Sequence, residues 1–328
     1  MSPSETAARP RVAVMGAGAV GSYFGGMLAR AGADVTFIAR PAHVEAIHCG
    51  GLFMDTVTFQ ERVRAAASAD PAGARDADFV LFSVKTLQTE EAARLLAPNL
   101  KPQSIVISLQ NGVDNVPRIR AASGINALPA VVYVAAALPE PGRVKHSGRG
   151  ELIVGELPGH EPADSAVPTR AARVAELFNS AGVPCKISGN IEADLWTKMV
   201  MNCAGNAVTA IAQTSYGHAA RNPHTRDMMA RVIEETIAVA RASGVRLPDT
   251  NFVEMGLKLA AALGDATSST AQDLSRGKRT EIDSLNGYIV RRGAELHIPT
   301  PVSSTLFALV KLIEETLEKR GRPAGASQ

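Results

Sequence analysis

Cysteine and long apolar segments are scarce in this sequence of 328 residues. Three cysteines stand far apart, with no CxxC pair and no histidine beside them at the spacing of metal ligands: Cys49, Cys185 and Cys203. This pattern indicates a reducing compartment and predicts no metal site. The apolar run over residues 127–139 contains Pro129 and is shorter than the roughly 20 residues of a membrane-spanning helix. We therefore expect a protein that does not cross a membrane.

Neither sign of charge dominates the chain. Lys and Arg number 34 and Asp and Glu 32, a formal net charge of +2 that is dispersed along the sequence. This balance gives no sign of a nucleic-acid-binding surface. The polar N-terminus, residues 1–11, contains Pro3 and Pro10 and lacks the apolar region of a signal peptide. We expect a cytoplasmic protein.

Length and composition predict two folded domains. At roughly 150 residues per domain, this chain corresponds to about two. Hydrophobic residues make up 46% and charged residues 20% of the sequence, which excludes wholesale disorder and a fibrous repeat. From the patterns described below we predict a flexible tail over 1–10, a first domain over 11–189, a second over 190–320 and a second tail over 321–328.

A glycine-rich turn begins the first domain. It reads Gly16-Ala17-Gly18-Ala19-Val20-Gly21, in the GxGxxG spacing, between a strand-like run at 11–15 and a helical stretch at 20–31. A second strand pattern follows at 34–39. In such a motif the glycines allow the turn, the approach of a pyrophosphate and close packing of helix on strand. The helix N-terminus then faces the phosphates. We predict a dinucleotide site; a purely structural turn is the alternative.

The residue after the second strand distinguishes the two nicotinamide dinucleotides. A carboxylate there would bind a ribose 2′-hydroxyl, but this sequence has Arg40. A guanidinium suits a 2′-phosphate, which a carboxylate would repel. The sequence therefore favours NADP(H), with an arginine in a solvated loop as the alternative.

The rest of the first domain alternates strand and helix patterns. Strands are predicted at 78–84 and 104–109, a helix at 87–96, further strands at 130–136, 143–146 and 152–154, and a helix at 166–181. We predict an α/β fold with a Rossmann-type, doubly wound parallel sheet. Lys85 and Asn111 follow two of its strands, where such sheets bind ligands. A solvated lysine and an ordinary Asn-Gly turn are the alternatives.

Long helical patterns replace strands after residue 191. They cover about 192–213, 222–244, 249–263, 269–296 and 303–319, and predict an all-α second domain. The first of these helices is apolar nearly all round, yet Lys198, Asn202 and Asn206 recur on it at i, i+4 and i+8. Burying such groups without partners is costly. Either a ligand or a neighbouring helix must meet this polar stripe.

A second polar segment runs from Ser268 to Asp283. Ile282, Leu285 and Ile289 supply its apolar face, which leaves Glu281 free to point elsewhere. A carboxylate near a buried lysine could keep that lysine charged. The alternative is a helix cap at Ser268 or Ser269 with Glu281 as a surface charge.

Together these motifs resemble the ketopantoate reductase family, the 2-dehydropantoate 2-reductases of the ApbA/PanE type. The resemblance covers nearly the whole chain. Its elements appear in order: GAGAVG at 16–21, SVK at 83–85, QNG at 110–112, PGRVKH at 141–146, LWTKMVMNCAGN at 195–206, SSTAQD at 268–273 and KRTEIDSLNG at 278–287. The lysine-asparagine helix and the TEID segment are specific, whereas many dehydrogenases share the glycine-rich turn.

The resemblance implies roles for individual residues. Lys198 matches the family's general acid, Asn202 and Asn206 its substrate-binding amides, and Ser269 a substrate-binding hydroxyl. Glu281 matches a carboxylate near the cofactor and the catalytic lysine. Lys85 and Asn111 match cofactor contacts, Asn111 also a substrate contact, and Ala137 a backbone contact to the cofactor. The implied cofactor is NADP(H) and the implied substrate a small 2-oxo acid.

Two departures from the family concern the substrate side. Tyr216 stands where many members have an asparagine before the glycine that matches Gly217, and Thr270 replaces a methionine after the paired serines. The identity of the oxo acid is therefore less determined than the type of reaction.

The resemblance implies hydride transfer from NADPH to the keto carbon of ketopantoate, with Lys198 as general acid, as a step of pantothenate and coenzyme A biosynthesis. A reductase of another 2-oxo acid or a 3-hydroxy acid is one alternative. A non-catalytic NADP(H) sensor is another, but it would not need the ammonium of Lys198. The helical domains of such reductases often pair, which implies a homodimer.

Overall fold

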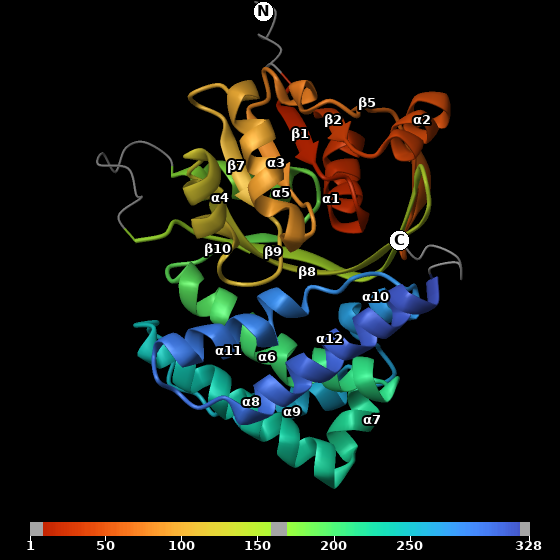
Figure 1. Ribbon diagram of the computed structural model, residues 1–328. Helices are drawn as coiled ribbons and strands as arrows, with labels where there is room; N and C mark the ends of the chain where they lie inside the picture. The colour runs from red at the N-terminus through yellow and green to blue at the C-terminus, as the bar shows by residue number, and fades with distance from the viewer. Residues whose placement is uncertain (1–8, 159–168, 322–328) are drawn as a thin grey trace, which may run out of the picture. The chain divides into compact units, whose positions relative to one another are not determined.

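The fold is given by a computed structural model of the chain, which describes residues 9–158 and 169–321. Two compact units, drawn in Figure 1, divide the chain: unit 1 is Met1–Ile191 and unit 2 is Glu192–Gln328. The predicted boundary lay two residues earlier. Most of both predicted tails, and the first residues of the helix predicted at 166–181, lie outside the described residues.

Unit 1 alternates strands and helices. Its strands are β1 (Arg11–Met15), β2 (Asp34–Ile38), β3 (Leu52–Asp55), β4 (Gln60–Val63), β5 (Ala66–Ser68), β6 (Phe79–Phe82), β7 (Ile105–Ser108), β8 (Leu128–Glu140), β9 (Arg143–Val154) and β10 (Cys185–Ile187). Its helices are α1 (Ala19–Arg30), α2 (Pro41–Gly50), α3 (Thr89–Leu96), α4 (Asn115–Ser123) and α5 (Arg170–Ser180), with short 3-10 turns η1 (Pro71–Ala74), η2 (Thr86–Gln88) and η3 (Ala97–Asn99).

All ten strands join one sheet in the order β4-β3-β9-β8-β7-β6-β1-β2-β5, with β10 beside β9. Neighbours from β8 to β5 are parallel, which confirms the doubly wound α/β part of the prediction. Beyond β8 the sheet is mixed, since β8–β9 and β3–β4 are antiparallel. A short turn at Gly142 (φ +76°) suffices to reverse the chain between β8 and β9. The strand patterns predicted at 130–136, 143–146 and 152–154 are parts of these two long strands.

Helices cover both faces of the parallel strands (Figure 1). Alternate residues of a strand point to opposite faces. Val12 and Val14 of β1 share one core with α1 and α5, in which Phe24 and Phe178 pack edge to face at 5.8 Å. Ala13 and its neighbours on the other face share a second core with α3 and α4. The central parallel strands β1, β6 and β7 are therefore buried on both sides, which explains their continuous apolar runs.

Unit 2 is helical throughout its described part. It comprises α6 (Ile191–Ala212), which begins one residue before the boundary, α7 (Tyr216–Arg221), α8 (Pro223–Ala242), α9 (Phe252–Ala262), α10 (Ser269–Ser275), the 3-10 turn η4 (Ile282–Ser284), α11 (Asn286–Glu295) and α12 (Pro301–Gly321). The prediction of an all-α second half is confirmed for these residues. Val200 and Ala204 of α6, Ile233 of α8 and Phe252 of α9 form one of its cores.

The single helix predicted over 269–296 is wrong. Gly277 adopts φ +63° and ends α10, where Lys278 donates its amide hydrogen to the carbonyl of Asp273 at 2.9 Å. The chain then passes through η4 before α11 begins. The apolar face predicted from Ile282, Leu285 and Ile289 is buried nevertheless, each residue being at most 2% exposed.

No described helix is long and apolar enough to cross a membrane. Within the described ranges, no cluster of three or more His, Cys, Asp or Glu side chains has the arrangement of a metal site.

Candidate active site

Four loops of unit 1 begin at one edge of its sheet. The parallel pairing aligns Met15 with both Ile38 and Phe82, so β1, β2 and β6 end side by side. Phe82 is in turn aligned with Ser108 at the end of β7. The residues that follow these ends are the glycine-rich turn, Arg40, Lys85 and Asn111. Parallel register therefore brings these predicted cofactor residues to the same edge.

The glycine-rich turn lies too close to its neighbours for side chains at two positions. Gly16 has φ +87°, and a Cβ there would be 2.7 Å from the backbone nitrogen of Val84. A Cβ on Gly21 would collide with Ser83 Oγ and lie 2.8 Å from Val14 Cγ1. Ser83 Oγ donates to the carbonyl of Gly16 at 2.8 Å, which joins the turn to the end of β6. These close contacts explain why positions 16 and 21 are occupied by glycine.

The backbone of this turn fits an anionic group. Gly16 and Ala17 donate their amide hydrogens to the carbonyl of Ile38, each at 3.1 Å, which holds the turn against the end of β2. The amide of Ser22 donates to the carbonyl of Gly18 at 2.8 Å, the first hydrogen bond of the helix. The amides before Ser22 belong to the first turn of α1, where N–H groups have no intrahelical acceptor and the helix dipole is positive. A pyrophosphate suits such a helix start.

Arg40 precedes α2 and its side chain is exposed. Its carbonyl accepts a hydrogen bond from the amide of His43 at 2.9 Å. His43 itself is buried; its Nδ1 accepts from the amide of Gly142 at 2.9 Å, so its Nε2 carries the proton and faces Ser22 Oγ at 3.2 Å. Burial, and then the charge of Arg40, lower the pKa of His43. A neutral histidine thus connects α1, α2 and the β8–β9 turn.

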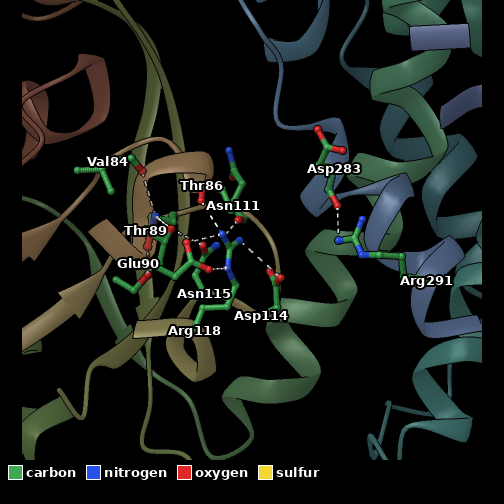
Figure 2. Close-up of polar contacts among 12 residues, drawn as sticks. Val84, Thr86, Thr89, Glu90, Asn111, Asp114, Asn115, Arg118, Asp283 and Arg291 are labelled. Atoms are coloured by element: carbon green, nitrogen blue, oxygen red, sulfur yellow. Dashed lines mark hydrogen bonds and ion pairs between the residues drawn. The ribbon is translucent and has the colours of Figure 1, made fainter. Parts of the chain in front are cut away.

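A buried polar network holds the loops of Lys85 and Asn111 together (Figure 2). Gln110 donates to the carbonyl of Val84 at 3.1 Å and to Thr89 Oγ1 at 2.8 Å. Asn115 Nδ2 donates to the carbonyl of Asn111 at 2.6 Å. Both loops are thereby held in place by the side chains of Gln110 and Asn115.

Arg118 of α4 completes this network. Its guanidinium donates to Glu90 at 2.6 and 3.0 Å and to the carbonyl of Thr86 at 2.9 Å, and also lies 3.7 Å from Asp114 (Figure 2). The hydrogen bonds from Arg118 lower the pKa of Glu90. The segment after Lys85 is therefore bound to α4 through a bidentate ion pair.

Ala137 lies inside β8, opposite Lys145 of β9, because this strand continues beyond the predicted end at residue 136. The register is irregular between Ala137 and Glu140. Its role in cofactor binding stays a prediction.

In unit 2, α6 carries the predicted polar stripe. Lys198, Asn202 and Asn206 lie one turn apart, and at 100° per residue they occupy one side of the helix. Lys198 and Asn202 are half-buried, and Asn206 is buried, with 3% of its surface exposed. The stripe combines one cationic donor with two amides, a set suited to an acid with a neighbouring carbonyl.

Asn206 has neighbours that the sequence alone did not reveal. Tyr216 donates its phenolic hydrogen to Asn206 Oδ1 at 2.6 Å, and Ser268 Oγ donates to the Asn206 carbonyl at 3.2 Å. Ser268 caps α10, as one alternative anticipated, whereas Ser269 is exposed in the first turn of that helix. Binding of substrate by Ser269 stays a prediction.

Glu281 stands at the start of η4, half-buried, in a segment held from behind by α12. Glu314 Oε1 accepts from both the amide and the hydroxyl of Thr280, each at 2.7 Å. Lys311 pairs with Glu314 Oε2 and with Asp283 Oδ2, both at 2.9 Å. Arg291 of α11 donates to the Asp283 carbonyl at 2.8 Å (Figure 2). The residues on both sides of Glu281 are therefore anchored.

The start of α11 is also anchored to α6. Asn286 Nδ2 donates to the carbonyl of Cys203 at 3.2 Å, and the rings of Trp196 and Tyr288 pack edge to face at 6.0 Å. The segment that carries Glu281 thus leads directly into a helix that contacts α6 at Trp196 and Cys203. The burial of Glu314 could have been predicted from the sequence. It follows Leu306 and Val310 at four-residue intervals and therefore lies on the same buried face of α12.

Both units match one protein family. Residues 12–159 match the family described as ketopantoate reductase PanE/ApbA, and residues 190–314 match its C-terminal domain. A protein of Archaeoglobus fulgidus named 2-dehydropantoate 2-reductase is 35% identical to this chain over 94% of the chain and 99% of its own length. A PanE/ApbA family ketopantoate reductase of Ralstonia eutropha, known by crystal structure, is 47% identical, with a TM-score of 0.86 over 94% of this chain and 99% of its own.

A third likeness concerns the fold alone. A D-mandelate dehydrogenase, solved as a ternary structure with NADH and anilino(oxo)acetate, has a TM-score of 0.84 at 24% identity, over 94% of this chain and 99% of its own.

Proposed function

This chain belongs to the ketopantoate reductase PanE/ApbA family, and on that premise we propose that it reduces 2-dehydropantoate to pantoate with NADPH. The observation that carries the proposal is the stripe of Lys198, Asn202 and Asn206 on one side of α6. A 2-oxo acid offers acceptor oxygens on its keto and carboxylate groups, and this stripe offers an ammonium and amide hydrogens. Formation of pantoate places the reaction in pantothenate and coenzyme A biosynthesis.

NADPH supplies, when bound, the hydride that reduces the keto carbon. Lys198 Nζ donates a hydrogen bond to the keto oxygen, stabilises the negative charge that develops there, and transfers its proton to that oxygen. Asn202 and Asn206 orient the acid, with Asn111 and Ser269 as further substrate contacts. Glu281 balances the charge of the ammonium. The product is the 2-hydroxy acid, and Lys198 regains its proton from solvent.

Residues of unit 1 support the cofactor assignment. The glycine-rich turn and the first turn of α1 suit the pyrophosphate, since no side chain fits at Gly16 or Gly21. Arg40 is exposed directly after β2, where its guanidinium suits a 2′-phosphate. Lys85 and the backbone at Ala137 supply further cofactor contacts. We therefore assign NADPH rather than NADH.

Replacement of Arg40 by alanine tests this cofactor choice. The Kd for NADPH should rise about 10- to 100-fold, the loss expected for a charged hydrogen bond, and the Kd for NADH should change less than twofold. Fluorescence titration of both dinucleotides measures the two constants. Arg226→Ala, at an exposed position on α8, is the control. An equal rise of the Kd for NADPH and the Kd for NADH would contradict the role of Arg40.

Substrate identity is tested by the consumption of NADPH, followed by its near-ultraviolet absorbance. The purified protein is offered ketopantoate beside 2-oxo acids of differing length and branching. Fast turnover of ketopantoate alone supports the proposal. Turnover of another acid alone would replace the substrate but keep the reaction, and this second candidate is favoured by Tyr216, which stands where many family members have asparagine and contacts Asn206. No turnover of any acid would favour a cofactor-sensing role.

A further inference from the structure

We propose that Tyr216 is a positioning residue that turns the amide of Asn206 into a pure hydrogen-bond donor toward an anionic or carbonyl oxygen of the substrate. This inference rests on the proposed function and deepens it, because it names the group that Asn206 recognises. It begins from the contact between Tyr216 Oη and Asn206 Oδ1, which is 2.6 Å long.

Tyr216 is held rigidly at the start of α7. Its amide donates to the carbonyl of Ala266 at 3.0 Å, and the next amide, of Gly217, donates to the carbonyl of Gly264 at 2.8 Å. The ring lies directly on α6, since a Cβ on Gly205 would be 2.5 Å from the ring carbon Cε1 of Tyr216. Glycine at 205 is what lets the phenol reach Asn206.

The hydrogen bond between Tyr216 and Asn206 has only one possible direction. A carboxamide oxygen carries no hydrogen and can only accept, whereas a phenol can donate. The atom that meets Tyr216 Oη is Asn206 Oδ1, at 2.6 Å. The phenolic hydrogen therefore goes to Asn206 Oδ1, and the carboxamide is oriented with its Oδ1 toward the ring.

The phenol keeps its proton throughout the physiological range. Burial raises the pKa of Tyr216 well above its usual range. Because Asn206 Oδ1 is occupied by this permanent donor, its Nδ2 is the group left for a ligand. Among the residues that the structure describes, Asn206 Nδ2 donates no hydrogen bond. The side chain of Asn206 thus offers a ligand two hydrogens and no lone pair.

Such a donor selects its ligand by chemistry. A carboxylate or keto oxygen can accept from Asn206 Nδ2, whereas a group that can only donate is left unpaired and is rejected. An anionic 2-oxo acid meets this requirement. A residue that can both accept and donate at position 206 would discriminate less.

The test compares Tyr216→Phe, which keeps the ring on Gly205, with Asn206→Asp and Asn206→Ala. With the 2-oxo acid that the wild type reduces fastest, Tyr216→Phe should raise KM about tenfold, change kcat less than threefold and leave the Kd for NADPH within twofold. Asn206→Asp, which replaces the donor by a carboxylate, should lower kcat/KM at least 100-fold. Tyr133→Phe, on β8 of unit 1, should change none of these values.

A double-mutant cycle separates positioning from a structural role. If Tyr216 acts through Asn206, adding Tyr216→Phe to Asn206→Ala should change kcat/KM less than twofold. The same factor in both backgrounds would overturn the proposal, as would an unchanged KM in Tyr216→Phe alone.

A measurement without turnover keeps the inference separate from the proposed function. In protein labelled with ¹⁵N in its asparagine side chains, the NH₂ signals of Asn206 are those absent from Asn206→Asp. They should be resolved and slow to exchange in the wild type, and shifted and faster to exchange in Tyr216→Phe. Unchanged signals would overturn the inference. A wild type that reduces no 2-oxo acid would overturn the proposed function, while these signals would still decide whether Tyr216 orients the amide.

Discussion

Unit 1 presents its candidate residues on loops that follow neighbouring strands, whereas unit 2 presents them on one helix supported by segments far away in the sequence. In unit 1, parallel register alone aligns the ends of β1, β2, β6 and β7. In unit 2, Asn206 is oriented by Tyr216 and bonded to Ser268, 62 positions later, and Thr280 is held by Glu314, 34 positions later. Backbone register thus places the candidate residues of unit 1, where a side-chain network braces two of the loops, whereas in unit 2 side chains from distant segments orient the candidate residues themselves.

This difference predicts which property each substitution will change. Substitutions in the glycine-rich turn should weaken cofactor binding, because they displace the backbone. Substitutions along α6 should leave cofactor binding intact and impair turnover. Substitutions in both units test whether cofactor binding and turnover separate in this way.

Lys198→Ala should have the largest effect. Loss of a general acid lowers kcat by about 10²- to 10⁴-fold, while the Kd for NADPH should stay within twofold because the residue belongs to α6 of unit 2. Steady-state kinetics and fluorescence titration measure both. Lys258→Ala removes an exposed lysine from α9, where it pairs with Glu254 at 2.6 Å, and should leave kcat unchanged. A kcat of Lys198→Ala within a few-fold of the wild-type value would contradict the role of Lys198 as general acid.

Gly16→Ala should show the opposite pattern. The left-handed backbone costs an L-residue about 1–2 kcal/mol, and the new Cβ would also press on the Val84 backbone. We expect a Kd for NADPH at least tenfold higher and an unfolding free energy lower by about 2 kcal/mol or more.

Gly32→Ala is the matched control for Gly16→Ala. Gly32 has a similar φ of +97° but nothing within 4 Å of its Cβ position. It should lose only about 1 kcal/mol and retain cofactor binding. If both variants had the same unfolding free energy and the same Kd for NADPH, the contact between residue 16 and the Val84 backbone would be unimportant.

Glu314→Gln tests the anchoring of the Glu281 segment. The variant loses the charge that pairs with Lys311, in a side chain only 3% exposed. We expect an unfolding free energy lower by about 2–3 kcal/mol and a kcat several-fold lower, because Glu281 is less well placed.

Glu318→Gln, one turn later on α12, is the control for Glu314→Gln. Glu318 is half-exposed and pairs with Arg279 at 3.3 Å, so its loss should cost less than about 0.5 kcal/mol. Urea denaturation and steady-state kinetics compare the two. Equal stability of both variants would show that α12 does not anchor the segment.

The smallest effect concerns the pH dependence of unit 1. The pKa of His43 is lowered from 6.5 in the folded protein, so just below pH 6.5 the unfolded chain binds more protons than the folded one. Stability should therefore fall as the pH drops through about 6.5 toward the folded pKa. The slope of unfolding free energy against pH should be smaller in His43→Gln, which does not titrate. Identical slopes would show that His43 is not responsible.

Several parts of the fold could be predicted because their signals are local. The strand, glycine-rich turn and helix at residues 11–30 lie next to one another in the chain, and their order predicted the parallel sheet. The long helix over 269–296 was predicted wrongly because it was continued through the polar segment at 275–281, where the left-handed backbone of Gly277 ends α10. Strands β6 and β7 have only four residues each but were predicted, because they are continuous apolar runs. Strands β3, β4, β5 and β10 were missed, because they are equally short and contain charged or small residues, so that they depend on pairing for their stability.

The α/β first half with its glycine-rich turn, the helical second half and the stripe of Lys198, Asn202 and Asn206 could be predicted, since each follows from residues adjacent in the chain or one helical turn apart. The packing of distant segments was needed to show that Tyr216 donates to Asn206, that Ser268 caps α10 and that Glu314 accepts from Thr280. Hydrogen bonds act over about 3 Å, and which distant side chains come that close depends on how the helices pack.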